Sequence, residues 1–77
     1  MKFPVDATQR DVLRAFSKLG FVVVRKGNHI ILERKNKDGS VTPLVLPNHR
    51  TIKSSTLRSI LSQSGIERNE FIKVFYY

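Results

Sequence analysis

The chain has 77 residues and no cysteine, which allows one domain over residues 1–77 and excludes disulfides and thiolate-bound metal. Fourteen lysine and arginine residues face six acidic ones, and the net charge of +8 favours nucleic acid, an acidic protein or an anionic membrane as the partner. The sequence contains neither an apolar run of about 18 residues nor an apolar N-terminal signal core. We therefore expect a soluble cytoplasmic protein. An anionic membrane is the least favoured of the three partners, because the apolar face of the one basic helix is expected to lie in the core.

A lead over residues 1–7, expected to be extended around Pro4, precedes an amphipathic helix over residues 9–19. Thr8 is a suitable N-cap with Asp11 three residues later, and a glycine at position 20 stops the helix. Apolar residues at helical spacing predict a core-facing side made of Val12, Leu13, Phe16 and Leu19. A basic stripe steps by four along another side, and we interpret it as a solvated face rather than an RNA contact; it consists of Arg10, Arg14 and Lys18.

Three segments rich in β-branched residues follow, over residues 21–25, 29–34 and 41–47. Short polar turns separate them, which predicts an antiparallel meander. Pro43 cannot donate to a ladder, so the third strand is expected at an edge. In the second strand, alternation assigns Ile30, Leu32 and Arg34 to one face and His29, Ile31 and Glu33 to the other.

Residues 47–53 are expected to leave the sheet as a loop. Ser54 or Ser55 is expected to cap a second helix, which runs to about Ser64 and is ended by Gly65. A short last helix is predicted over residues 67–75. The expected fold is α+β, in the order α-β-β-β-α, with a three-stranded antiparallel sheet, helices on one face and a short extra C-terminal helix. So small a core leaves no room for an enclosed cofactor.

The turn between the first two strands is the most informative stretch. Gly27-Asn28 is a two-residue hairpin signal, because both residues tolerate positive φ. His29 follows it directly, and Arg25 and Lys26 precede it. A side chain placed there is held by the sheet yet open to solvent, which suits proton transfer. An idle surface histidine is an equally weighted interpretation of the pattern alone.

Histidine combined with cations suits one reaction well. RNA is cleaved without metal when its 2′-hydroxyl attacks the adjacent phosphate, which needs a base, an acid and stabilisation of the phosphate charge. Histidine can serve as acid or base near neutral pH. Zinc is disfavoured because the two histidines lie twenty residues apart without cysteine, so we expect no metal and no cofactor. His49 is a secondary candidate, although a side chain that bonds to the loop backbone or caps the sheet edge is the favoured interpretation there.

Four segments together resemble the HicA toxins, small mRNA interferases of bacterial and archaeal toxin–antitoxin pairs. Residues 20–29 read Gly-Phe-Val-Val-Val-Arg-Lys-Gly-Asn-His, where that family has Gly-Phe, apolar residues, Arg and a Gly-Ser-His turn. Residues 47–49 match its Pro-x-His segment, residues 55–61 its Gly-Thr-Leu-x-x-Ile-Leu run, and residues 65–71 its closing Gly-Ile/Leu-x-x-x-x-Phe segment. Asn28 replaces the usual serine and Ser55 the usual glycine.

The resemblance implies a fold similar to a double-stranded-RNA-binding domain, with His29 as the catalytic residue of a metal-independent endoribonuclease. It implies mRNA as substrate and a HicB-type antitoxin as protein partner. We expect RNA to contact Arg25, Lys26, Gly27, Asn28 and Lys53. Two alternatives remain open, namely a non-catalytic module that binds RNA or the antitoxin, and a domain whose basic surface only recognises an acidic protein.

Overall fold

The computed structural model describes residues 2–77, so the start of the predicted lead, Met1, lies outside the described residues. The elements in chain order are β1 (Asp6–Thr8), α1 (Gln9–Lys18), β2 (Val22–Lys26), β3 (His29–Lys35), β4 (Val41–Pro47), β5 (Thr51–Lys53), α2 (Ser54–Ser64) and α3 (Arg68–Tyr76). Strands β2, β3 and β4 form an antiparallel sheet with β3 in the middle, which confirms the predicted meander and the edge position of the strand that contains Pro43.

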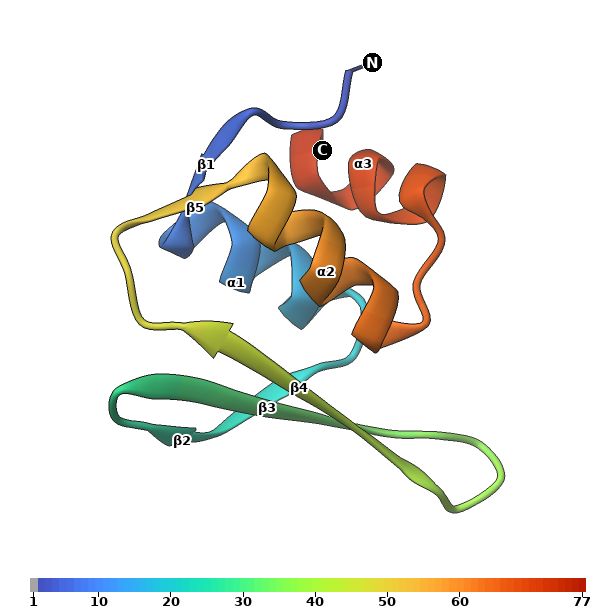
Figure 1. The fold of residues 1–77 in the computed structure, drawn as a ribbon. Coiled ribbons are helices and arrows are strands. Elements are labelled where there is room, and N and C mark those ends of the chain that lie inside the picture. Colours follow the sequence, from blue (N-terminus) through green and yellow to red (C-terminus); the bar gives the residue numbers. More distant parts are fainter. Residues whose placement is uncertain (1) are drawn as a thin grey trace.

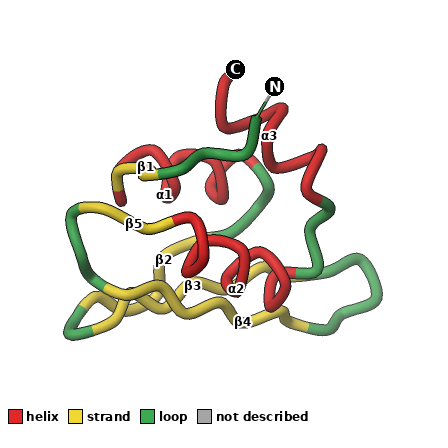
Figure 2. Tube along the Cα trace, turned by 45° about the horizontal axis from the view of Figure 1, so that its top comes forward, coloured by secondary structure: helices red, strands yellow, loops and turns green. Residues whose placement is uncertain are grey.

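The elements lie in layers (Figure 1). Helices α1 and α2 cover one face of the β2-β3-β4 sheet, and α3 lies on the far side of these helices together with the N-terminal segment (Figure 2). The Phe3 and Phe71 rings, with centroids 6.2 Å apart, hold that segment against α3. The α+β fold with helices on one sheet face is confirmed.

Alternation along β3 explains how the sheet is oriented. Ile30 and Leu32 are buried beneath the helices, whereas His29 and Glu33 are exposed and Ile31 is half-buried. In β4 the opposite residues repeat the pattern, because Leu44 and Leu46 are fully buried. The predicted assignment of β3 residues to the two faces is therefore confirmed, and we call the face without helices the open face.

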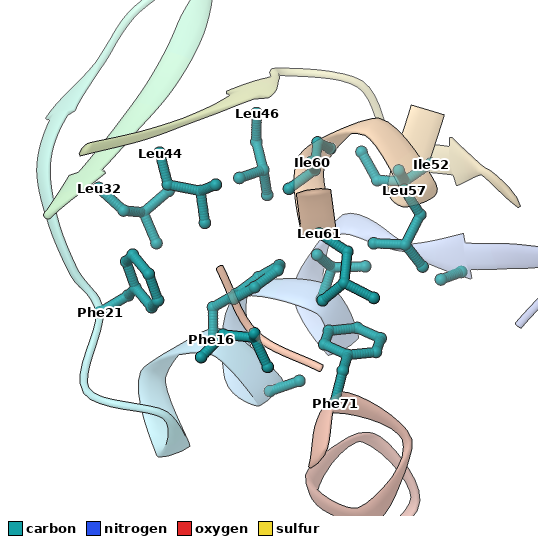
Figure 3. Packing of buried hydrophobic residues seen from close by; sticks show 14 of the residues in the cluster. Phe16, Phe21, Leu32, Leu44, Leu46, Ile52, Leu57, Ile60, Leu61 and Phe71 are labelled. Carbon is teal, nitrogen blue, oxygen red and sulfur yellow. The ribbon is translucent and has the colours of Figure 1, made fainter. Parts of the chain in front are cut away.

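Phe16 of α1 lies at the centre of the core (Figure 3). Its ring centroid is 5.6 Å from that of Phe21 and 5.2 Å from that of Phe71, so it joins the segment before β2 to α3. Aromatic pairs at these separations add roughly 0.5–1.5 kcal/mol each beyond the area they bury. The core-facing side predicted for α1 supplies Val12 and Phe16 to the core, and α2 and α3 supply Leu57, Ile60, Leu61 and Phe71.

The ends of the helices follow the predictions with one exception. The Thr8 hydroxyl accepts a hydrogen bond of 3.1 Å from the Asp11 amide, as expected for an N-cap. Gly65 ends α2 in the left-handed conformation, with φ of 73°. No serine side chain caps α2, because the helix already begins at Ser54 and its N-cap position is Lys53.

Two segments expected to lack paired structure form a second, two-stranded sheet. Asp6, Ala7 and Thr8 of β1 pair with Lys53, Ile52 and Thr51 of β5. Buried Ala7 and Ile52 face the core from this pair. The prediction of a loop over residues 47–53 was therefore wrong for its last three residues, and the pairing fixes where both α1 and α2 begin.

The β3–β4 turn is held by an acidic side chain. The Asp38 carboxylate accepts a 2.6 Å hydrogen bond from the Ser40 hydroxyl and a 2.9 Å hydrogen bond from the Ser40 amide. These two bonds, the hydroxyl first, lower the pKa of Asp38 below its ordinary value of 3.8. The ionised carboxylate is thus favoured in the folded state.

We predict that this turn weakens in acid. A lowered folded-state pKa gives stability that is fully present above the unfolded value of about 3.9 and is lost as the pH falls through the folded value. Asp38→Asn should therefore flatten the decline of the unfolding temperature below about pH 4, because the variant has no carboxylate to protonate. Thermal unfolding of both proteins between about pH 2 and pH 7 checks this, and parallel curves would contradict it.

Candidate active site

His29 is the first residue of β3 and lies on the open face. It is exposed, and its backbone partner in β4 is Pro47. The buried neighbour Ile30 sets this orientation, since adjacent residues of a strand point to opposite faces. The end of a strand thus carries the imidazole, which reaches solvent.

The turn before His29 differs from the predicted one. Gly27 and Asn28 both lack positive φ, so this is not a two-residue turn of the expected kind. The last cross-strand pair joins Lys26 to Ile30, which leaves residues 27, 28 and 29 between them. The Gly27 amide donates a 3.0 Å hydrogen bond to the His29 carbonyl and closes the reversal.

A β-bulge at Val24 decides which cation accompanies His29. Val23 pairs with Leu32, but Arg25 pairs with Ile31, so Val24 is an extra residue in β2. Without the bulge the register would place Arg25 opposite buried Ile30. With it, Arg25 lies opposite Ile31 and so shares the open face with His29.

These residues enclose a shallow hollow of about 230 Å³ beside the turn. Its lining consists of Arg25, Gly27, Asn28, His29 and Ile31. The hollow thus brings four of the predicted site residues together with an apolar neighbour. It combines an imidazole, which can accept or donate a proton, with a permanent cation.

The other predicted site residues lie elsewhere. Lys26 pairs with Ile30 and therefore points to the opposite side of β2 from Arg25. Lys53 belongs to the β1–β5 sheet, where it pairs with Asp6, and it does not line the hollow. His49 lies in the β4–β5 loop, and within residues 2–77 its imidazole makes no hydrogen bond, so the expected bond to the loop backbone is absent.

Two polar residues that the sequence analysis did not select connect the turn to the start of α1. Asn48 donates a 2.8 Å hydrogen bond from its side-chain amide to the Gly27 carbonyl. Gln9, the first residue of α1, donates a 2.8 Å hydrogen bond to the Asn48 side-chain oxygen. The sequence offers one weak signal for this, since Asn48 is the central residue of the Pro-x-His segment.

The family described as "HicA toxin of bacterial toxin-antitoxin" has a model that matches residues 9–66. The chain belongs to the HicA toxin family. The matched part runs from the start of α1 to just beyond α2 and contains the whole hairpin that carries His29. The protein is therefore a toxin of a toxin–antitoxin system, and its membership of this family implies an antitoxin as partner. A search of curated proteins found no match to this HicA chain.

No helix within residues 2–77 is long and apolar enough to cross a bilayer. Within the same residues, no three histidine, aspartate or glutamate side chains gather in a group that could hold a metal ion.

Two glycines provide a test of the observed turn. Gly65→Ala should destabilise the protein by about 1 kcal/mol, because a Cβ strains the left-handed backbone at φ of 73°. Gly27→Ala should change stability by less than about 0.5 kcal/mol, since its φ is not positive and an added Cβ meets no atom within 4 Å. Urea unfolding of both variants measures the difference. An equal loss of stability in both variants would contradict the observed turn and support the positive-φ turn that the sequence predicted.

Proposed function

We propose that this HicA toxin is a metal-independent endoribonuclease that cleaves mRNA, with His29 as its catalytic residue. The observation that carries the proposal is the hollow on the open face, where exposed His29 and Arg25 lie on the same side of two paired strands. The place of this pair within the matched HicA segment supports it further.

The reaction needs few groups. The RNA 2′-oxygen forms a bond to the adjacent phosphorus while the bond from phosphorus to the 5′-oxygen breaks, which yields a 2′,3′-cyclic phosphate and a free 5′-hydroxyl. His29 would take the proton from the 2′-hydroxyl or give one to the leaving 5′-oxygen. Arg25 would stabilise the negative charge that builds on the phosphate, because its guanidinium is always charged and can bind two oxygens at once.

The remaining charges act at longer range. Net charge of +8 on so small a domain attracts a polyanion over its whole surface. Lys26 and Lys53 would contribute to this field, whereas Gly27 and Asn28 would lie beside the scissile phosphate because they line the hollow. Sequence preference should be weak, since few side chains are available to read bases.

The same charge favours an acidic antitoxin, and we propose that the partner is of the HicB type. Binding of such a protein over the hollow would exclude RNA from His29. The proposed substrate, mRNA, also implies that the toxin acts in the cytoplasm.

Replacement of His29 tests the catalytic role. His29→Ala should reduce cleavage of a model mRNA by about 10²–10⁴-fold, the usual contribution of one positioned acid or base. Because the side chain is exposed, the thermal unfolding midpoint should stay unchanged. Cleavage by the unmodified toxin should persist in excess EDTA. Controlled expression in cells, followed by growth and bulk mRNA integrity, provides the matching measurement in vivo.

His49→Ala is the matched control, because it removes the other histidine of the sequence, which does not line the hollow. This variant should retain activity. Equal cleavage by the unmodified toxin and His29→Ala would refute the catalytic assignment. A folded toxin that binds RNA and never cleaves it would instead favour the non-catalytic module.

The bulge at Val24 generates a second prediction, on RNA binding. In the His29→Ala background, affinity for a single-stranded RNA should fall with salt with a slope of about 0.7 per phosphate contact. Arg25→Gln should reduce that slope by about 0.7, because Arg25 lies on the face of the hollow. Lys26→Gln removes the same charge from the next residue, which lies on the opposite face, and should reduce the salt slope less. Fluorescence anisotropy at several KCl concentrations measures both, and equal reductions would show that the bulge does not select Arg25.

A further inference from the structure

We infer that Asn48 and Gln9 are positioning residues for His29, an inference that rests on the ribonuclease function proposed above. The two side chains form a hydrogen-bonded chain that links the turn carrying His29 to the first residue of α1. Neither residue lines the hollow. They act through the turn and not on the substrate.

This hydrogen-bonded chain connects the β2–β3 turn, the β4–β5 loop and the start of α1. Asn48 Nδ2 donates to the Gly27 carbonyl at 2.8 Å, and Gln9 Nε2 donates to Asn48 Oδ1 at 2.8 Å. Gln9 Nε2 also donates to the His49 carbonyl at 3.0 Å. The Gln9 backbone amide donates to the Arg50 carbonyl at 2.9 Å, so four bonds lock the β4–β5 loop between the turn and α1.

The direction of every bond in the chain is set by its ends. A backbone carbonyl can only accept, so Asn48 must present its NH₂ group to Gly27 and its oxygen to Gln9. Gln9 must in turn present its NH₂ group to both Asn48 and the His49 carbonyl. The two amides satisfy this arrangement. A carboxylate at position 48 would face the Gly27 carbonyl, and one at position 9 would face both the Asn48 oxygen and the His49 carbonyl.

The turn has little else to hold it. It lacks the left-handed residues that make a two-residue hairpin rigid, and its own closing bond is the one from Gly27 to the His29 carbonyl. Figure 1 shows the β2–β3 turn at the same end of the sheet as the end of β4, from which the β4–β5 loop runs toward the start of α1. The Asn48 bond is therefore the link that ties this turn to the rest of the molecule at its tip.

Asn48→Asp is the sharpest test, because it keeps the side-chain shape and turns the donor that faces the Gly27 carbonyl into a carboxylate oxygen. It should lower kcat for RNA cleavage by about 10- to 100-fold, as expected when a catalytic group is misplaced. KM should change by no more than about twofold, because substrate contacts are retained. Gln9→Glu should lower kcat in the same direction by less, since it breaks the chain one bond further from the turn.

Asn69→Asp is the matched control, because it makes the same charge change on exposed α3, and it should leave kcat unchanged. Hydrogen exchange of the Gly27 amide gives a readout that does not depend on cleavage. It should accelerate by about tenfold in Asn48→Asp and stay unchanged in Asn69→Asp.

The outcomes separate the two proposals. If the unmodified toxin cleaves RNA but Asn48→Asp matches Asn69→Asp in both kcat and Gly27 exchange, the positioning role is refuted and the ribonuclease function stands. A raised KM with unchanged exchange would make Asn48 a substrate contact and also refute positioning. If the unmodified toxin cleaves no RNA, the proposed function fails, and the exchange rates alone show whether the chain holds the turn.

Discussion

Burial of Ile30 and Leu32 beneath the helices is the constraint on which the site depends. These two side chains fix the register of β3, because a slip of one residue would move them to solvent and carry His29 into the core. Neither exchange is tolerable in a domain whose core contains few residues, since burying an unpaired imidazole and exposing two large aliphatic groups each cost several kcal/mol. The same packing that stabilises the sheet therefore keeps the proposed catalytic group on the open face, without any contact to the imidazole itself.

The site is assembled from segments that are distant in the sequence. His29 and Arg25 come from one hairpin, Asn48 from the loop that follows the third strand of the meander, and Gln9 from the start of α1. The β1–β5 pair holds the two helix starts in place, and the Gln9 amide bonds to the loop between β4 and β5. The turn is thus supported by its neighbours more than by its own backbone. A substitution near Gln9 can affect the turn without altering any residue that lines the hollow.

Much of this fold was predictable, and the failures have physical reasons. The helices and the meander were identified because apolar residues recur at periods of 3.6 and 2, as in the alternation from His29 to Glu33. The β1–β5 pair was missed because three-residue strands are too short to show a period. The bulge was missed because Val22, Val23 and Val24 are identical, so the sequence pattern does not change when one of them is an extra residue. The bond from Asn48 to Gly27 joins residues 21 positions apart through one amide, and no periodic pattern encodes it. The predicted type of turn was wrong, because Gly27 and Asn28 tolerate positive φ but neither adopts it in the structure.

The extra residue at Val24 has a consequence beyond the orientation of Arg25. Strand β2 is an edge strand with three exposed valines, at positions 22 to 24, and all of its residues are solvent-accessible. Such an edge invites the strands of other copies to add to it, which leads to aggregation. A bulge interrupts the regular spacing of amide and carbonyl groups and bends the strand, so a straight partner strand finds no continuous ladder. The extra valine therefore both places Arg25 on the open face and makes the exposed edge of β2 a poor template for the strand of another copy.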